Sequence, residues 1–198
     1  EESPMAKKSN RNTRGRIVSA AWKLFYEQGY EDTTVEEIIE LSGTSKGSFY
    51  HYFDGKDALL STLSSLFDEK YEELTGLLTP EMTAMEQLLF LNRELFHMIE
   101  DSISLDLLAR LYSTQLTTNG EKHLLDHNRI YYKLLRKIIA KGQAEGQLSS
   151  RSNVNEMVKL YALCERALLY DWCLCAGEYA LTEYSAKVLP GFLSSFLP

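Results

Sequence analysis

Apolar residues recur every three or four positions along most of this 198-residue chain, which is the spacing of one face of an α-helix. Only four prolines and eleven glycines interrupt the pattern, and this scarcity argues against a sheet-rich fold. We therefore predict an all-α protein of about nine helices, long enough for one small and one larger domain. The helices are expected over residues 14–28, 35–41, 46–53, 56–78, from 80 past 99, over 105–116, 120–144 and 153–175, and from 182 onward.

Residues at the helix ends support these ranges. Thr13 is expected to cap the first helix. Thr79 and Pro80 are expected to start the fifth, because proline is favoured in the first turn. Pro190 should kink or interrupt the ninth. The helix over 56–78 is too long for the small N-terminal domain, so we predict that it connects the two domains.

Residues 33–60 predict two short helices joined by a tight turn and followed by a third helix, which is the arrangement of a helix-turn-helix. Thr33 stands three residues before Glu36, the spacing of a capping box at a helix start. Gly43 supplies the backbone freedom that the turn needs, and Ser45 is placed to cap the second helix. Plain packing units share this pattern, so DNA binding and packing both remain open at this point.

The second of these helices is predicted to present polar and aromatic side chains to solvent. Phe49 and Phe53 stand four residues apart and can anchor its inner face. The N-terminal residues of such a helix approach base edges, and its N–H groups meet phosphate. Gly47 lowers helix stability there, which suggests close approach of a backbone. The residues on or near the outer face are Lys46, Gly47, Ser48, Tyr50 and His51. The alternative is a surface helix with an exposed aromatic pair.

Charge is distributed unevenly along the chain. Residues 5–26 hold six basic residues and no acidic one, whereas residues 31–198 hold 15 basic and 25 acidic residues, a net charge of −10. The overall pI of about 5.2 does not favour nucleic acid, but a basic arm beside a reading helix can neutralise several phosphates. A solubilising tail is the alternative. We expect the four residues before Met5 to be an expression remnant.

Residues from about 13 to 60 resemble the DNA-binding domain of the TetR family of bacterial transcriptional regulators. The resemblance rests on the stretches TRGRIVSAAWKLFYEQGYEDTTVEEI, LSGTSKGSFYHYF and DGKDALL, in that order. Thr44 departs from the family, which more often has an apolar residue there. The resemblance implies that Thr34 and Lys56 meet phosphate and that the second helix faces the DNA through Lys46, Gly47, Tyr50 and His51. The candidate DNA-binding residues are Thr34, Ser45, Lys46, Gly47, Ser48, Tyr50, His51 and Lys56.

The resemblance also implies a division of the chain. We expect residues 1–12 to form a basic arm that is partly disordered, and residues 13–55 to form the helix-turn-helix DNA-binding domain. Residues 56–198 are expected to form a larger helical domain for ligand binding and dimerisation, in which residues 56–78 are the connecting helix.

The eighth predicted helix is apolar on more than one side, so it must bury two faces. The resemblance implies that one of them meets a second copy of the chain, because TetR-like proteins dimerise through their last two helices. The candidate interface residues are Leu168, Trp172, Val188 and Phe192. A helix at the centre of a monomer is the alternative.

Tyrosine is frequent, with twelve residues, and several fall on the helices of the larger domain. Aromatic walls with a few polar tips suit a cavity for a small organic molecule, although core or interface positions are the alternative explanation. Glu165 and Arg166 interrupt the apolar eighth helix, and a charge in such a helix needs a partner. The candidate ligand-binding residues are Phe67, Tyr71, Phe96, His97, Tyr112, Asn128, Tyr131, Tyr161 and Glu165.

Other chemistry is weakly indicated. His123 and His127 stand four apart with Asp126 between them, but no third ligand motif accompanies them, so we expect no metal site. Three cysteines cluster late in the chain and suit reduced thiols in the cytoplasm. The sequence has no signal peptide, membrane span, phosphate-binding glycine loop or nucleophile motif. We therefore expect neither an enzyme nor a cofactor.

Together these observations predict a cytoplasmic, homodimeric transcriptional regulator with no membrane contact. We expect a repressor that releases a pseudo-palindromic double-stranded DNA operator when an unidentified small-molecule effector binds the larger domain. Two alternatives remain: a helix-turn-helix protein whose larger domain binds a protein partner, and a helical small-molecule-binding protein that does not read DNA.

Overall fold

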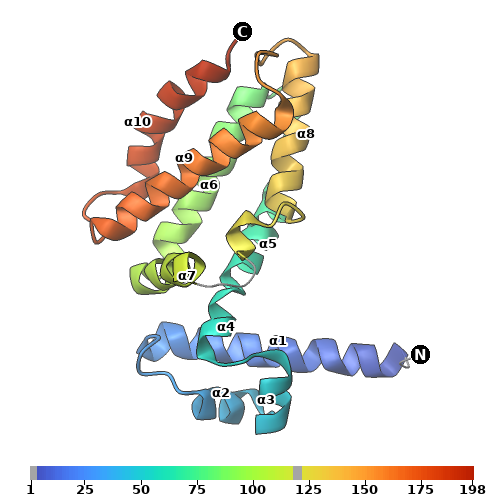
Figure 1. The fold of residues 1–198 in the computed structure, drawn as a ribbon, viewed down its shortest axis with the longest axis vertical. Coiled ribbons are helices and arrows are strands. Elements are labelled where there is room, and N and C mark those ends of the chain that lie inside the picture. The colour runs from blue at the N-terminus through green and yellow to red at the C-terminus, as the bar shows by residue number, and fades with distance from the viewer. Residues whose placement is uncertain (1–3, 118–121) are drawn as a thin grey trace. The chain divides into compact units, whose positions relative to one another are not determined.

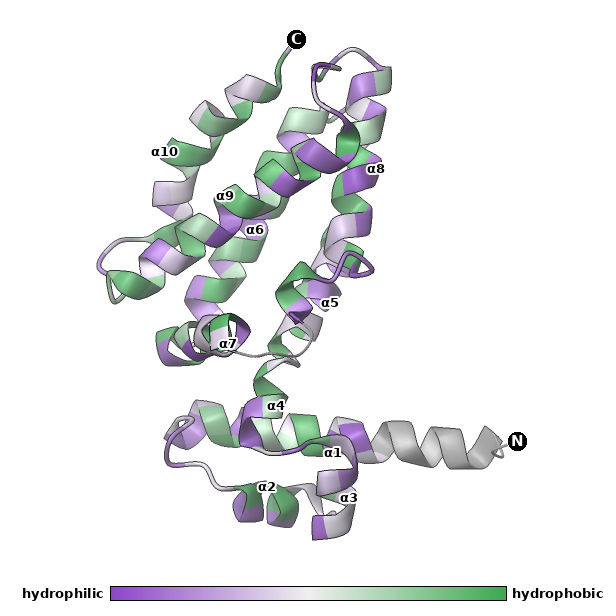
Figure 2. Ribbon diagram, in the orientation of Figure 1, coloured by the Kyte–Doolittle hydropathy of each residue, from purple (hydrophilic) through white to green (hydrophobic). Residues whose placement is uncertain are grey.

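The computed structural model describes residues 4–117 and 122–198, and the regular elements in these ranges are ten α-helices and two short 3-10 helices. The all-α prediction is confirmed. The chain divides into two compact units, residues 1–63 and 64–198 (Figure 1). Figure 2 shows apolar and polar residues on different sides of the helices, as expected for helices that pack one face inward.

The first unit is a small bundle of short helices that pack on one long helix. It contains α1 (Pro4–Gln28), α2 (Val35–Ser42), α3 (Lys46–Tyr52) and α4 (Lys56–Leu60). Helix α1 packs against α2 and α3, which also pack against each other. Fully buried side chains from all four helices form its core: Ile17, Ile38, Phe49 and Leu59.

The first helix begins earlier than predicted. Helix α1 includes residues 4–12, which we expected as a partly disordered arm, and Thr13 lies inside the helix instead of capping it. Pro4 suits a first turn, because the N–H that proline lacks has no partner there in any helix. No glycine or further proline stands between Pro4 and Thr13 to end the helix. The side chains of residues 1–12 lie outside the described part of the structure.

Helix α2 has the predicted capping box, one residue later than predicted. The Thr34 hydroxyl accepts a hydrogen bond from the Glu37 N–H, and the Glu37 carboxylate accepts one from the Thr34 N–H at 2.7 Å. Thr33 is buried instead, and its hydroxyl donates to the Gly29 carbonyl at 2.7 Å. Gly43 ends α2 in the left-handed conformation with φ of 59°, and Ser45 caps α3 as predicted.

The predicted helix over 56–78 is wrong as a single element. The structure has α4, then a turn at Ser61 and Thr62, then α5 (Leu63–Thr75). The Ser61 hydroxyl donates to the Ala58 carbonyl at 2.7 Å, and the Thr62 hydroxyl donates to the Leu59 carbonyl at 2.6 Å. Such hydroxyls compete with backbone N–H groups for helix carbonyls. The indole of Trp22 donates to the Thr62 hydroxyl at 2.8 Å and so holds the turn against α1.

The second unit is a larger helical bundle. It contains most of α5, α6 (Ala84–Ser102), α7 (Leu105–Thr117), the 3-10 helix η1 (His123–Leu125), α8 (Ile130–Ala144), α9 (Val154–Leu174), α10 (Leu181–Leu193) and the 3-10 helix η2 (Ser194–Phe196). Helices α6 and α9 each pack against both α8 and α10, and α7 packs against α9 (Figure 1). Side chains from α6, α8 and α9 therefore meet in one core.

Two helix starts and one helix interior in this unit differ from prediction. Helix α6 starts after a capping box of Thr83 and Glu86, instead of at Pro80. Helix α8 starts at Ile130 instead of 120, and residues 118–121 lie outside the described ranges. Helix α10 continues through Pro190 without interruption. Pro190 lies at an exposed position of α10, while the buried Leu189 and Leu193 hold the helix on both sides of it.

Gly142 lets α8 lie close to the start of α6. A Cβ atom at this position would lie 2.5 Å from the Ala84 Cβ and 2.9 Å from the Leu148 Cδ1. The first contact is between two short side chains that have no rotamer by which to move away. Close packing at this point therefore requires glycine.

We predict that Gly142→Ala lowers the free energy of unfolding by about 1–3 kcal/mol, because the added methyl overpacks the helix contact. Gly15→Ala is the matched control, since a Cβ at this exposed position in α1 would meet nothing within 4 Å. The control should raise stability by about 0.5–1 kcal/mol through helix propensity. Urea unfolding of the two variants checks both signs, and similar midpoints would contradict the close approach.

Candidate functional site

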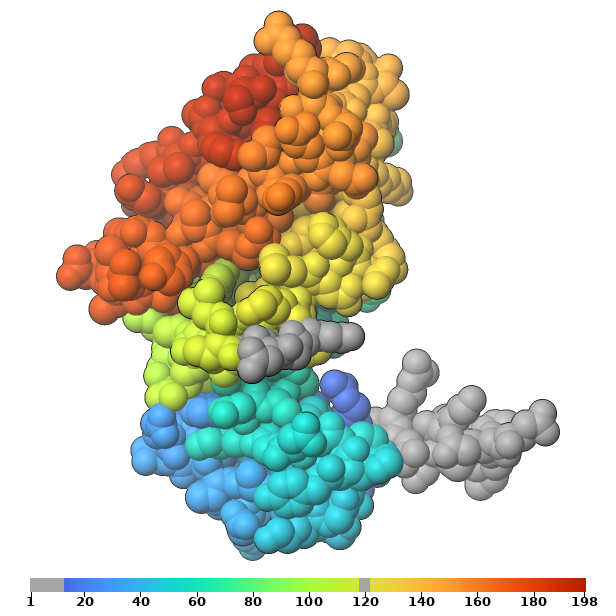
Figure 3. Space-filling view, viewed as in Figure 1, coloured from blue at the N-terminus to red at the C-terminus, as the bar shows by residue number. Residues whose placement is uncertain are grey.

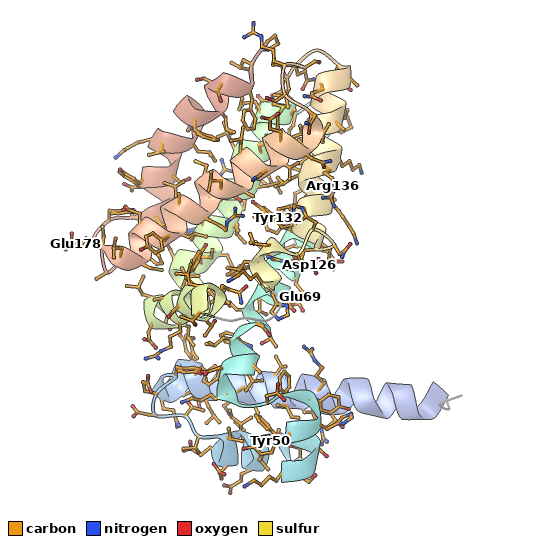
Figure 4. The ribbon with its side chains drawn as sticks, in the orientation of Figure 1. Tyr50, Glu69, Asp126, Tyr132, Arg136 and Glu178 are labelled. Carbon is orange, nitrogen blue, oxygen red and sulfur yellow. The ribbon has the colours of Figure 1, made fainter. Side chains whose placement is uncertain are left out.

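The first unit presents residues of α3 from its first to its last turn to solvent. Lys46, Gly47, Tyr50 and His51 are exposed, while Phe49 lies in the core as predicted. Figure 4 labels Tyr50 on this helix, and Figure 3 shows the surface of the unit on the viewed side. We call these four exposed residues the α3 surface. Their exposure leaves them free to contact a partner, and DNA contact by each of them stays a prediction.

The start of α3 has features that suit a phosphate or a base edge. The Ser45 hydroxyl accepts from the Ser48 N–H at 3.1 Å and donates to the Ser48 hydroxyl at 2.9 Å. A Cβ at Gly47 would have only the Ser45 hydroxyl near it, at 3.9 Å, so nothing inside the protein requires a glycine there. Lys46 lies 3.9 Å from the Glu36 carboxylate, with both side chains more than 70% exposed. Such an exposed pair is weak and leaves Lys46 available.

Lys56 has a different role from the predicted phosphate contact. Its ammonium donates to the carbonyls of Tyr30, Glu31 and Thr33 at 2.6, 3.3 and 2.9 Å, and it lies 4.3 Å from the Tyr30 ring centroid. An ammonium has three donors, and all three are used. The Tyr30 hydroxyl also donates to Asp57. Lys56 therefore holds α4 to the turn between α1 and α2.

Thr34 is committed to its helix cap. Both its N–H and its hydroxyl donate to the Glu37 carboxylate, at 2.7 and 2.8 Å. These bonds lower the pKa of Glu37, with the backbone bond from Thr34 as the largest cause. A carboxylate thus already occupies the start of α2. A phosphate contact by Thr34 stays a prediction.

In the second unit, a buried carboxylate joins three helices. Glu165 of α9 is 4% exposed, and its oxygens accept hydrogen bonds from Tyr131 of α8 at 2.6 Å, Asn92 of α6 at 2.8 Å and Tyr161 of α9 at 3.0 Å. Asn92 in turn accepts from the Ser185 hydroxyl of α10 at 2.5 Å. We call this group the Glu165 cluster.

Burial controls the protonation of the cluster. Loss of water raises the pKa of Glu165, and the hydrogen bonds from Tyr131, Asn92 and Tyr161 oppose that rise. The pKa values of Tyr131 and Tyr161 are raised well above their usual range, first by burial and then by the Glu165 charge. The tyrosines therefore stay protonated and donate to the carboxylate.

A small cavity of about 50 Å³ borders the cluster. Its lining residues, which define the Glu165 cavity, are Phe67, Tyr71, Leu95, Tyr112, Leu124, Arg129, Tyr131, Glu165, Arg166 and Leu169. The Tyr71 hydroxyl is the one buried side-chain polar atom of the described residues that has no hydrogen-bond partner. Its ring lies 5.0 Å from the Tyr131 ring, centroid to centroid. A buried orphan hydroxyl at a cavity marks a place for a ligand atom or a water.

The two arginines of the cavity lining have partners of their own. Arg129 pairs with both oxygens of Asp68, at 3.0 and 3.1 Å, and also donates to the Ser64 carbonyl at 3.1 Å. Arg166 donates to the Tyr132 hydroxyl at 3.2 Å. The charge of Arg129 is thereby balanced by Asp68.

Five of the nine predicted ligand-binding residues line this cavity, and Tyr161 contacts it through Glu165. The remaining three do not: Phe96 is fully buried outside the lining, His97 is exposed and pairs with Asp101 at 3.4 Å, and Asn128 is exposed. Sequence reasoning missed Asn92. Its polar side chain stands among the apolar positions of α6 that face the core, and this pattern could have indicated a buried hydrogen-bond partner.

A second, larger hollow of about 680 Å³ lies along α6 and α10. Its lining residues are Glu81, Met82, Glu86, Leu89, Phe90, Asn92, Arg93, Thr182, Ser185, Ala186 and Pro190. Asn92 and Ser185 bond to each other, so this groove has no buried polar group left without a partner among the described residues.

Two predicted interface residues are buried within the chain. Leu168 and Trp172 are 6% and 8% exposed, and the Trp172 indole donates to the Tyr179 carbonyl at 2.9 Å. They are therefore removed from the candidate interface. The exposed apolar residues of α9 are Leu163, Ala167, Tyr170 and Leu174, which we call the α9 stripe. Val188 and Phe192 on α10 are half-buried and stay candidates.

The histidines, the cysteines and the apolar helices considered in the sequence analysis are described next. Within the described ranges, no group of three or more His, Cys, Asp or Glu side chains could hold a metal ion. His123 and His127 are both exposed. The three cysteines are free. None of the described helices is both long and apolar enough to cross a membrane.

Residues 17–63 match the family model for bacterial regulatory proteins of the tetR family. The chain is similar to the HTH-type transcriptional regulator QacR of Staphylococcus aureus, with 36% identity over 62 residues, 31% of this chain and 33% of QacR. Several curated relatives are matched over about a third of their length or less. A fatty acid metabolism regulator protein of Bacillus subtilis is 23% identical over 88% of this chain and 90% of its own.

The fold is similar to that of Thermus thermophilus FadR, a TetR-family transcriptional repressor solved in complex with lauroyl-CoA. The TM-score is 0.75 and the identity 26%, over 93% of this chain and 95% of the FadR chain.

We predict that Tyr71→Phe raises the free energy of unfolding by about 1 kcal/mol or leaves it unchanged, because it removes a buried hydroxyl that has no partner. Tyr131→Phe makes the same chemical change but removes a bond to Glu165, and should lower stability by about 1.5–3 kcal/mol. Thermal unfolding of the two variants measures the difference. A loss of stability in Tyr71→Phe as large as that in Tyr131→Phe would contradict the orphan status of the Tyr71 hydroxyl.

Proposed function

We propose that this chain is a member of the tetR family of bacterial regulatory proteins and a homodimeric transcriptional repressor that releases its operator when a small molecule binds the second unit. The observation that carries the proposal is the exposed side of α3 within the matched residues 17–63. We place the protein in the cytoplasm, where its operator would lie, and assign it no catalytic role.

The α3 surface supports a role in the major groove. A helix enters the groove with its N-terminal residues toward the base edges, and Lys46 and Gly47 occupy that end. Tyr50 and His51 are exposed one turn later on the same helix. Gly47 leaves space for a close approach, and Lys46 supplies a positive charge. Base choice would fall to Tyr50 and His51, since a lysine on phosphate adds affinity without sequence preference.

The α9 stripe supports dimerisation. Its residues stand four, three and four positions apart, which places them along one side of the helix. Leu163 and Leu174 are 53% and 70% exposed. A single chain therefore leaves apolar surface of α9 in contact with water. Covering this stripe with the same stripe of a second copy gives a two-fold interface, to which Val188 and Phe192 of α10 would contribute.

The Glu165 cavity supports an effector site. Phe67 and Tyr71 on α5 line it, and α5 continues through Ser61 and Thr62 into α4. A ligand that displaces Tyr71 would shift α5 and thereby bias the first unit. Coupling of this kind is typically about 1–3 kcal/mol and is reciprocal, so the operator would weaken effector binding by the same factor.

We do not extend lauroyl-CoA to this chain. Ligand pockets usually enclose about 300–1,000 Å³, so the Glu165 cavity of about 50 Å³ would have to open for any organic ligand, and much further for a long acyl chain than for a compact one. A long acyl chain would also have to lie against the buried Glu165 carboxylate, which an apolar chain cannot satisfy.

The DNA-binding proposal predicts different effects for two lysines. Lys46→Ala should weaken binding to a labelled DNA duplex of mixed sequence and reduce the salt-dependence slope by about one, with no change in thermal stability. Lys56→Met should lower the unfolding temperature, because three carbonyls lose their donor. Lys137→Ala on the exposed side of α8 is the control for charge alone. An unchanged salt slope in Lys46→Ala would argue for a helical protein that does not read DNA.

The dimer proposal predicts that Leu163→Glu splits the dimer, because it buries an unpaired charge at an apolar contact. Leu77→Glu, at a leucine 56% exposed between α5 and α6, should leave the dimer intact. Leu168→Glu should destabilise the fold itself. Sedimentation velocity separates the first two variants and thermal unfolding detects the third. A monomeric wild type at micromolar concentration would refute the proposed interface.

A further inference from the structure

The Glu165 carboxylate is buried with neutral hydrogen-bond donors around it. Its Oε1 accepts from Asn92 and Tyr161, whereas its Oε2 accepts from Tyr131. Ionised carboxylates offer about four acceptor positions, so a position on Oε2 is open to a further donor. No cationic group of the described residues lies within 4 Å of either oxygen in the manner of the Arg129–Asp68 pair. Buried charges are usually paired with an opposite charge.

A second acceptor lies at the same cavity. The Tyr71 hydroxyl has no hydrogen-bond partner, and its ring stacks at an angle on that of Tyr131, whose hydroxyl donates to Glu165 Oε2. A hydroxyl both donates and accepts, so Tyr71 can accept from a ligand N–H that also reaches Glu165. The open position on Glu165 Oε2 and the Tyr71 hydroxyl thus offer two acceptor positions to a donor group of a ligand.

The walls of the cavity suit the body of such a ligand. The rings of Phe67, Tyr71, Tyr112 and Tyr131 line it, and aromatic faces attract cations. Of the two arginines in the lining, Arg129 is neutralised by Asp68. Arg166 donates to the neutral Tyr132 hydroxyl and keeps its charge, which acts on Glu165, so a bound cation shares the carboxylate with it.

We propose that the effector is a small organic cation, a protonated amine on a compact apolar body, which ion-pairs with Glu165 and donates a hydrogen bond to Tyr71 between aromatic walls. This inference rests on the proposed function, because it names the ligand class of the proposed effector site. The cavity of about 50 Å³ must open to admit the apolar body. Tyr112, Leu124, Arg129 and Arg166 are the half-buried members of its lining. Because Asp68 holds Arg129, the other three are the side chains that would have to move.

Binding to the full-length chain tests the ligand class. Three amines of increasing length, benzylamine, phenethylamine and hexylamine, are compared with 2-phenylethanol and 3-phenylpropanoate, which keep a similar body and replace the ammonium by a hydroxyl or a carboxylate. Titration calorimetry should detect at least one of the amines at millimolar concentration and neither of the other two. Binding of the alcohol or the carboxylate as tightly as the amines would overturn the inference, as would the absence of heat from all three amines.

Three variants test the contacts. Glu165→Gln keeps the shape and removes the charge, and should weaken the bound amine about a hundredfold. Tyr71→Phe should weaken it about fivefold without loss of thermal stability, because a single hydrogen bond is removed. Glu69→Gln, at an exposed position of α5, is the matched control and should bind as the wild type does. Amine affinity that is unchanged in both Glu165→Gln and Tyr71→Phe would overturn the assigned site.

The DNA assay keeps this test separate from that of the proposed function. If the wild type binds DNA with the expected salt dependence and no amine binds, the ligand class is wrong and the regulator remains. If amines bind with the expected variant pattern and the wild type binds no DNA, the ligand class stands and the repressor assignment fails.

Discussion

The arrangement of the second unit depends on one buried carboxylate. Glu165 on α9 is satisfied by Asn92 from α6 and Tyr131 from α8, and Asn92 is bonded to Ser185 on α10. Apolar packing supplies most of the stability of a helical bundle, but it tolerates small shifts between helices. A buried carboxyl group does not, because each lost donor leaves an acceptor oxygen with neither a protein partner nor water. The cluster therefore fixes how these four helices face each other.

Features determined by neighbours in sequence were predictable from the sequence. The cap at Ser45 and the buried position of Phe49 follow from residues within one or two helical turns. The start of α2 at Val35 was predicted correctly, but its capping residue was predicted one position early, because two threonines are followed by two glutamates and either register gives a capping box. The register is decided by Thr33, whose burial and bond to Gly29 place Thr34 at the cap.

Features determined by contacts distant in sequence were not predictable. Helix α9 is apolar around most of its circumference, so its pattern indicates two buried faces without saying which one meets the chain's own core. Leu168 faces inward and Leu163 outward because of how α7, α8 and α10 pack on this helix. Lys56 likewise looks like a free cation in the sequence, and only the fold brings three carbonyls to its ammonium.

The turn between α4 and α5 limits how a signal from the cavity can reach α3. A continuous helix over 56–78 would act as a rigid rod, whereas the observed turn at Ser61 and Thr62 allows α5 to move with a change of few backbone angles. That movement is not free, because the Thr62 hydroxyl is held by Trp22 of α1 and Leu63 is fully buried. In the proposed mechanism, a shift of Tyr71 would therefore reach α1 through Thr62, which Trp22 holds. Helix α1 packs directly against both α2 and α3, so the long first helix, more than α4, is the element through which an effector would change the α3 surface.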